Sequence, residues 1–312
     1  MGYTFFVPML SRNHYKDLVW IDLESPSKDE VRRVMKEFDL HPLIAEELLT
    51  PSAKPKAERY QDMLYVVLRF PVSRHSHGGR EDQEVDFVIG KKFLITTHYD
   101  IVDPIHKFSK VFEVNSILKE NDIGDHAGHL FCHILRKLYR SVEHELEYLN
   151  DYLREIEDHI FSGMEQEMVV EISRTGRVLL SFKHSLMHHQ LLLESLEGAG
   201  RSFFGEPFGY HIRTIIGEYN RIENTIEAYT GTIAELRETN NSLVSTKQNE
   251  TMKILTIISV FTFPLSLIAV VFSMNTPNNP VAGSPYDFWI VVGMMFAAAA
   301  ALFAFFKYKK WL

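Results

Sequence analysis

Two long apolar stretches dominate the hydrophobic pattern near the end of the 312-residue chain. Residues 254–272 and residues 288–306 each run for nineteen positions without a charged side chain. A bilayer core about 30 Å thick is crossed by roughly 20 helical residues. The pattern therefore predicts two transmembrane helices, at 254–272 and at 288–306, and hence a lipid bilayer as a partner.

Lysines on either side of these stretches predict their orientation. Lys247 and Lys253 precede the first stretch, and the tail at 307–312 holds three more, whereas the intervening segment 273–287 contains no Lys or Arg. Positively charged flanks favour the cytoplasmic side of a membrane. We therefore expect a multi-pass protein of the cell inner (plasma) membrane with both termini cytoplasmic, a basic cytoplasmic tail and an extracytoplasmic loop at 273–287.

One face of the first apolar stretch mixes hydroxyls with apolar side chains. On a helical wheel this face carries Met252, Leu255, Thr256, Ser259, Phe263, Ser266 and Val270. Such a stripe is compatible with the lining of a pore. It is also compatible with hydroxyls that bond back to their own helix or across to a neighbouring helix.

A heptad series precedes the membrane segment and predicts a stalk helix over 208–253. Its steps alternate between three and four residues, which is typical of a coiled-coil-like seam. The series consists of Ile212, Ile215, Tyr219, Ile222, Ile226, Tyr229, Ile233, Leu236, Asn240 and Leu243. The same face turns polar after Leu243, which indicates either an aqueous vestibule or an interfacial collar.

The pattern of the first 125 residues predicts an α/β domain. We expect strands at 18–23, 63–70, 85–89 and 93–98, because these runs are rich in Val, Ile, Tyr and Phe. Helices are expected at 27–38, where Ser27 and Glu30 form a capping box, and at 42–49. We expect an exposed loop at 73–82 and a tight turn at Gly90 between these strands.

Long helices, at about 126–161 and 165–197, fill the region 126–207. The expected fold is an α+β/α membrane protein. A cytoplasmic α/β domain and long helices lead into a stalk that continues as the first of two C-terminal transmembrane helices.

Charge and motifs exclude other classes of protein. Five lysines against two carboxylates give residues 247–312 a net charge of +3. Because the whole chain has a net charge of −8, residues 1–246 carry a net charge of −11. An acidic body argues against nucleic acid as a partner. His144-Glu145 lacks the second histidine of a zinc hydrolase, and there is no glycine-rich phosphate loop. We therefore expect neither an enzyme nor a cofactor.

Several motifs resemble the CorA magnesium-transporter family. They are Gln248-Asn249-Glu250-Thr251-Met252-Lys253, Phe263-Pro264-Leu265, Ser273-Met274-Asn275, Trp20-Ile21-Asp22-Leu23, Lys54-Pro55-Lys56-Ala57-Glu58, Phe93-Leu94-Ile95-Thr96-Thr97-His98 and Lys309-Lys310-Trp311-Leu312. The resemblance covers the whole chain, and in that family the first membrane helix ends in Gly-Met-Asn.

The resemblance implies a homopentameric funnel that conducts divalent cations, chiefly Mg²⁺ with Co²⁺ or Ni²⁺ as further cargo, down their gradient. Ser273, Met274 and Asn275 would form the selectivity filter, with Asn275 holding the hydrated metal ion. Asn249, Met252, Leu255, Phe263 and Ser266 would line the pore, in agreement with the stripe found on the wheel.

Two departures from the family pattern stand out. Ser273 replaces the glycine of the motif, and Thr214 stands where the family places a regulatory aspartate. Glu238 is the remaining acidic candidate for a regulatory metal contact on the stalk. A solvated helix face is the simpler interpretation of Glu238.

Two rival functions remain open. The family's ZntB branch, which moves Zn²⁺ or other transition metals with proton coupling, also has a divergent tripeptide. Histidines four apart, His129 with His133 and His184 with His188, have a spacing that ligates zinc. A non-conducting membrane-anchored scaffold or metal sensor is the third possibility, motivated by Ser273 and by a loop with Asp287 as its one acid.

Overall fold

The computed structural model describes residues 9–71, 82–100, 102–118, 126–274 and 286–309. The chain forms two compact units, residues 1–237 and residues 238–312. We call them the N-terminal unit and the C-terminal unit. The expected boundaries at 125, 207 and 253 stay predictions.

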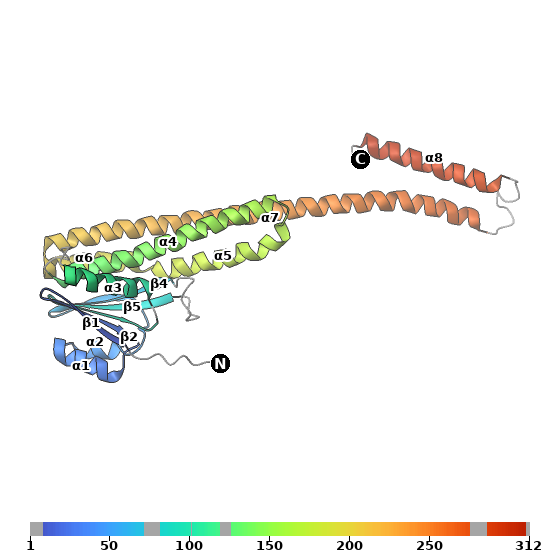
Figure 1. The fold of residues 1–312 in the computed structure, drawn as a ribbon. Helices are drawn as coiled ribbons and strands as arrows, with labels where there is room; N and C mark the ends of the chain where they lie inside the picture. Colours follow the sequence, from blue (N-terminus) through green and yellow to red (C-terminus); the bar gives the residue numbers. More distant parts are fainter. Residues whose placement is uncertain (1–8, 72–81, 101, 119–125, 275–285, 310–312) are drawn as a thin grey trace. The chain divides into compact units, whose positions relative to one another are not determined.

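A six-stranded sheet forms the centre of the N-terminal unit, in the order β1-β2-β6-β5-β4-β3 (Figure 1). Its strands are β1 (Met9–Tyr15), β2 (Leu18–Glu24), β3 (Lys56–Tyr60), β4 (Met63–Pro71), β5 (Asp82–Ile89) and β6 (Phe93–His98). The pair β2–β6 is parallel and the other four pairs are antiparallel. All four predicted strands are confirmed, while β1 and β3 were not predicted. The predicted loop at 73–82 lies outside the described residues except for Asp82, which begins β5.

Two short helices, α1 (Lys28–Phe38) and α2 (Pro42–Glu47), cover one face of the sheet. The capping box is confirmed, because the Ser27 backbone N–H donates to Glu30 Oε2 at 2.8 Å and Ser27 Oγ accepts from the Glu30 N–H at 3.3 Å. Apolar side chains fill the space between helices and sheet, including Ile21, Leu23, Val34, Ile44, Val67, Val88 and Ile95.

The other face of the sheet packs against α3 (Asp103–Leu118) and α4 (Ala127–Phe161). Trp20 meets Phe112 of α3 edge to face at 5.4 Å, and Phe87 meets Phe131 of α4 at 5.0 Å. The helix α3 was not predicted. Together with α4 it lines a cavity.

The predicted helix at 165–197 is wrong in its extent. The chain forms α5 (Glu165–Leu186), turns at Met187 and His188, and continues as α6 (His189–Phe204). No proline or glycine marks this break in the sequence. The turn brings the fully buried His189 ring to α4, where Nδ1 lies 2.8 Å from the Tyr139 hydroxyl, so a tertiary contact accompanies the break.

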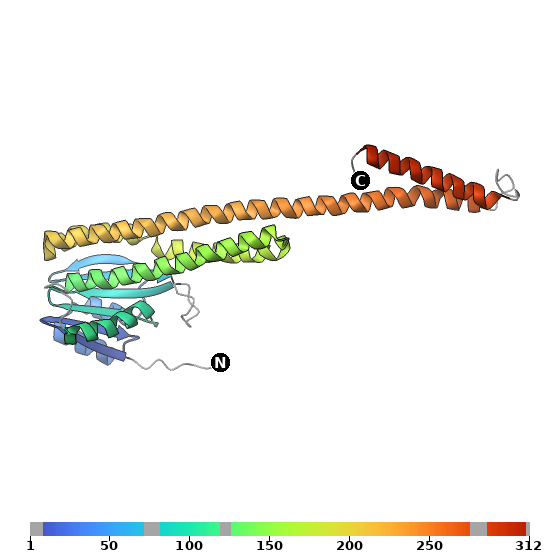
Figure 2. The same ribbon diagram turned by 45° about the horizontal axis from the view of Figure 1, so that its top comes forward.

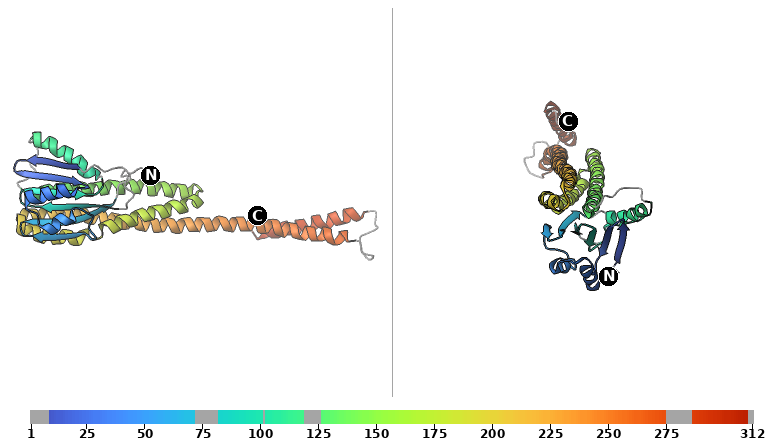
Figure 3. Two further views of the ribbon diagram at one scale, coloured as in Figure 1. Left: turned by 90° about the horizontal axis from the view of Figure 1, so that it is seen from below. Right: turned by 90° about the vertical axis from the view of Figure 1, so that its left-hand side faces the viewer.

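The heptad seam lies on α7 (Glu206–Ser273), and most of its members are buried within a single chain. Its members Ile212, Ile215, Tyr219, Ile222, Ile226, Ile233 and Leu236 are at most 6% exposed. Arg136 of α4 pairs with Glu218 at 3.6 Å, and Lys183 of α5 pairs with Glu227 at 3.9 Å. The seam therefore packs α7 against the chain's own α4 and α5 (Figure 3).

The C-terminal unit contains the end of α7 and the helix α8 (Asp287–Tyr308), which lie side by side (Figure 2). By length and composition both helices are apolar enough to cross a membrane. Pro264 lies inside α7 and donates no backbone hydrogen bond there. The backbone carbonyl of Val260 consequently loses its usual helical donor.

Candidate functional site: a face of α7

The contact between α7 and α8 assigns the sides of α7. The rings of Phe261 and Phe306 stack with centroids 5.5 Å apart, and Phe306 is 3% exposed. Partly buried positions recur along α7 on this side at helical spacing: Ile257, Phe261, Pro264, Leu265, Ile268 and Phe272. These residues form the α8-facing side of α7.

The opposite side of α7 carries the residues that the wheel singled out as pore-lining. At 100° per residue, Phe263 points about 200° away from Phe261, and Ser259 about 200° away from Ile257. We call this side the open face. It consists of Asn249, Met252, Leu255, Thr256, Ser259, Phe263, Ser266 and Val270, all exposed in the single chain.

Large apolar side chains are prominent on the open face. Met252, Leu255, Phe263 and Val270 are between 58% and 72% exposed. Such a contiguous apolar strip on a helix requires cover from lipid or from other helices. The Ser and Thr residues between them give the face a mixed character that a purely lipid-facing surface does not need.

Two of the three hydroxyls on the open face are bound back to their own helix. Thr256 Oγ1 donates to the Met252 carbonyl at 2.7 Å, and Ser259 Oγ donates to the Leu255 carbonyl at 2.9 Å. Within the described residues the Ser266 hydroxyl makes no such bond. The back-bonded hydroxyls still present oxygen lone pairs to whatever lies on this face.

The predicted filter is only partly described. Ser273 is the last residue of α7, and its Oγ donates to the Val270 carbonyl at 2.9 Å. Met274 follows and is 54% exposed. Asn275, the predicted ligand of the hydrated ion, lies outside the described residues.

Glu238 lies on the extension of the open face toward the N-terminus of α7. Steps of seven residues connect it through Ser245 to Met252, Ser259 and Ser266. Its side chain is exposed and, among the described residues, makes no ion pair. Thr214 is exposed on the same helix and donates to the Tyr210 carbonyl at 3.1 Å.

The histidine pairs do not assemble a metal centre. The His129 ring lies 5.0 Å from that of His211, and burial together with the neighbouring Arg136 lowers the pKa of His133. His184 and His188 are exposed. Across the described ranges, no three His, Cys, Asp or Glu side chains are arranged to hold a metal ion.

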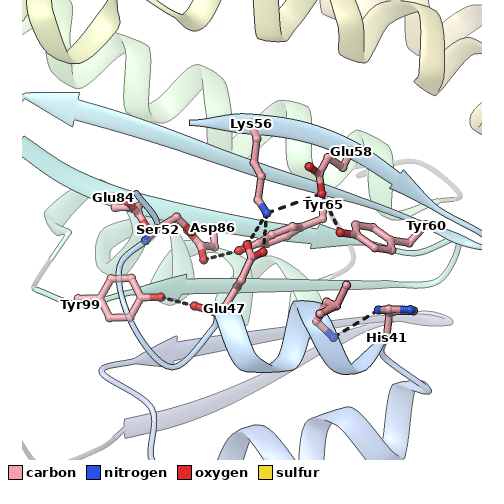
Figure 4. Close-up of polar contacts among 11 residues, drawn as sticks. His41, Glu47, Ser52, Lys56, Glu58, Tyr60, Tyr65, Glu84, Asp86 and Tyr99 are labelled. Carbon is pink, nitrogen blue, oxygen red and sulfur yellow. Dashed lines mark hydrogen bonds and ion pairs between the residues drawn. The ribbon is translucent and has the colours of Figure 1, made fainter. Parts of the chain in front are cut away.

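A partly buried polar network, which the sequence analysis did not predict, connects α2 to the sheet (Figure 4). The Tyr65 hydroxyl donates to Asp86 Oδ2 at 2.9 Å, and the Tyr99 hydroxyl donates to the Glu47 backbone carbonyl at 3.1 Å. Lys56 Nζ lies 2.5 Å from a Glu47 carboxylate oxygen. The only sequence signal was a carboxylate, Asp86, inside a predicted apolar strand.

Asp86 has an unusual protonation equilibrium within this network. Its side chain is fully buried, and burial followed by the charge of Glu84 raises its pKa well above the ordinary range. Glu84 itself accepts a hydrogen bond from the Ser52 N–H at 2.6 Å and pairs with Arg69 at 3.4 Å. The contribution of this network to the stability of the sheet therefore depends on pH.

Comparison with known proteins identifies relatives along the full chain. A family model described as CorA-like Mg²⁺ transporter protein matches residues 15–309. The cobalt/magnesium transport protein CorA of Thermotoga maritima is 25% identical over 298 residues, covering 94% of this chain and 83% of the relative.

Two solved structures share the fold. The complete structure of the CorA magnesium transporter from Methanocaldococcus jannaschii aligns with a TM-score of 0.84 at 20% identity, covering 99% of this chain and all of that one. The ZntB cytoplasmic domain from Vibrio parahaemolyticus aligns with a TM-score of 0.62 at 14% identity, covering 79% of this chain and all of that one.

Proposed function

The chain belongs to the CorA-like Mg²⁺ transporter family and is thus a divalent-cation transporter rather than an enzyme, and we propose that it conducts Mg²⁺ through a homopentameric pore. The ion moves down its electrochemical gradient across the cell inner membrane. Co²⁺ and Ni²⁺ are secondary cargo. The relatives named for cobalt and magnesium transport support this choice of ions.

The observation that carries the proposal is the position of the open face. Because α8 packs on the opposite side of α7, Met252, Ser259, Phe263 and their neighbours remain uncovered in the single chain. In a ring of five chains these faces would converge on one axis. The mixture of hydroxyls and apolar side chains suits a path for a hydrated ion better than a lipid-facing surface.

The chemistry of the path follows from how Mg²⁺ holds water. Mg²⁺ dehydrates reluctantly, so a ring of Asn275 amide oxygens would select the hydrated ion through its water shell. Asn249 would offer a second amide ring. Rings of Met252, Leu255 and Phe263 would form hydrophobic constrictions that close by dewetting.

The membrane potential supplies the driving force. A divalent ion that crosses 100 mV gains about 4.6 kcal/mol, so uptake needs no nucleotide hydrolysis. Lysines precede the first span and follow the second, and none lies between the two spans. Because positively charged flanks favour the cytoplasmic side of a membrane, this distribution supports cytoplasmic termini.

Zinc transport with proton coupling is the second candidate. Ser273 in place of glycine and the shared fold with the ZntB cytoplasmic domain favour it. A non-conducting scaffold or metal sensor is the third. Its support is the same serine, which would narrow the outer mouth if the glycine serves close packing.

Ion flux into proteoliposomes distinguishes the three functions. Mg²⁺, Co²⁺, Ni²⁺ and Zn²⁺ are supplied separately, with and without a pH gradient. Mg²⁺ entry that is independent of the pH gradient is the expected result. Zn²⁺ entry that requires the pH gradient would transfer the assignment to the zinc branch, and no flux of any of the four ions would favour the scaffold.

A further inference from the structure

A solvent-open cavity of about 450 Å³ lies between α3 and α4 in the N-terminal unit. Its volume falls within the range of about 300–1,000 Å³ that is typical of small-molecule sites. From α3 the wall includes Asp103, Lys107 and Phe108, and from α4 it includes Lys137, Arg140 and Glu145. None of these residues has a role in the proposed ion path.

Three cations converge on this cavity. Lys107, Lys137 and Arg140 are exposed, and within the described part of the chain none of them forms an ion pair with a carboxylate. Other cations on α4 and α7 do pair: Arg136 with Glu218 at 3.6 Å, and Arg221 with Glu143 at 3.7 Å. In a chain of net charge −8, a cavity with unpaired cations on two helices is suited to a phosphate-bearing anion.

The other residues that line the cavity restrict the class of ligand that it can bind. Asp103 and Glu145 bring two carboxylates to the same cavity, which would repel a bare polyphosphate. Mg²⁺ in proteins is usually held by one or two carboxylates together with the phosphates of a bound ligand. Phe108 and Val111 add an apolar and aromatic wall against which a base or sugar can pack.

We propose that the α3–α4 cavity binds a nucleoside polyphosphate together with its Mg²⁺ ion. Lys107, Lys137 and Arg140 contact the phosphates, and Asp103 with Glu145 faces the metal. The site is independent of whether the pore conducts, since it lies wholly within the N-terminal unit. It would allow the protein to respond to the magnesium-bound nucleotide.

The test is calorimetric titration of ATP into the full-length protein in detergent, pre-equilibrated with Mg²⁺ so that cation binding elsewhere contributes no heat. The expected result is saturable binding that weakens at least about tenfold in Arg140→Glu. Lys107→Gln, a milder change, should weaken it in the same direction. The matched control is Arg154→Glu, an exposed arginine on the same helix outside the cavity, which should bind as the wild type does.

Three outcomes of the ATP titrations would overturn the proposal. They are an absence of binding up to millimolar ATP, an equal loss in Arg154→Glu, and equal affinity for ATP in EDTA, which would remove the metal from the site. Inorganic phosphate that competes with ATP at equal concentration would likewise contradict a site built for a nucleotide. Asp103→Asn should reduce the preference for ATP with Mg²⁺ over ATP in EDTA.

Discussion

The Phe261 ring on α7 stacks on the Phe306 ring on α8 at a centroid distance of 5.5 Å, with 23° between the ring planes. Phe263, two residues along, points to the other side of the helix and is 72% exposed. This relationship divides α7 into a side that the chain itself covers and a side that it leaves for other chains, lipid or ions.

Removal of the stack should weaken the pairing of the two helices. Phe306→Ala deletes a buried ring, and an aromatic pair contributes about 0.5–1.5 kcal/mol beyond its buried area. We expect the thermal midpoint in detergent to fall by a few degrees. Phe303→Ala, which truncates a ring that is 52% exposed on the same helix, is the control. An equal loss in both variants would contradict the assignment of sides.

Leu255 should act as a hydrophobic constriction. Leu255→Ser would make the ring wettable, so we expect Mg²⁺ flux into proteoliposomes to rise under conditions that close the wild-type pore. Ile254→Ser is the matched control, because Ile254 and Leu255 are adjacent and 60% and 58% exposed but differ in face. Flux that rises in the Ile254 variant alone would place the constriction elsewhere.

Asn275 should select the ion at the outer mouth. Asn275→Ala removes the amide oxygen that would hold the hydrated cation, so we expect Mg²⁺ flux to be abolished or to lose its preference over the other divalent ions. The oligomer size on gel filtration should not change. Asn279→Ala serves as a control for the loop, and unchanged flux and selectivity in the Asn275 variant would rule out the ring.

Asp86 should make the N-terminal unit less stable as pH rises. Because its pKa is raised in the fold, largely by burial, the folded state holds a proton that the unfolded state has released once the pH exceeds about 4. Unfolding free energy then falls as the pH increases toward the folded pKa, by up to ~1.4 kcal/mol per pH unit.

The variant Asp86→Asn tests this directly, because it is neutral and keeps an acceptor for the Tyr65 hydroxyl. We expect its thermal midpoint to exceed that of the wild type at pH 7–8 and to approach it near pH 4. Asp151→Asn, an exposed carboxylate on α4, should leave the profile unchanged. Parallel profiles for wild type and the Asp86 variant would show that this carboxyl does not set the pH dependence.

Much of the fold was predictable because its signals are local. Nineteen uncharged positions predict a span whatever surrounds them, and the strand 85–89 was rich enough in Val, Phe and Ile to be recognised. The strand β3 has the sequence Lys-Ala-Glu-Arg-Tyr and lies at the edge of the sheet, so its polarity concealed it. The break before His189 accompanies the contact with Tyr139, which no local pattern reveals.

The candidate site, like the fold, was predictable only where its signals are local. Helical periodicity alone collected Met252, Ser259 and Phe263 on one face, since a wheel depends only on 3.6 residues per turn. It could not say which side α8 covers, because that depends on the pairing of distant residues such as Phe261 and Phe306. The α3–α4 cavity was equally hidden, because Lys107 and Arg140 meet only through the packing of two helices.

Cysteine modification tests the open face most directly. The chain has one native cysteine, Cys132, which is buried, and burial raises the pKa of its thiol to about 12, so it should not react. Ser259→Cys and Ser266→Cys place a thiol on the open face, and Ile257→Cys and Ile268→Cys place one on the α8-facing side.

Each variant is reconstituted in proteoliposomes, and Mg²⁺ flux is measured before and after a positively charged, water-soluble thiol reagent. If the open face lines the path, the reagent will block flux through the Ser259 and Ser266 variants and spare the Ile257 and Ile268 variants. Block confined to the Ile257 and Ile268 variants, or conducting Ser259 and Ser266 variants that the reagent leaves unaffected, would contradict a pore lined by this face of α7.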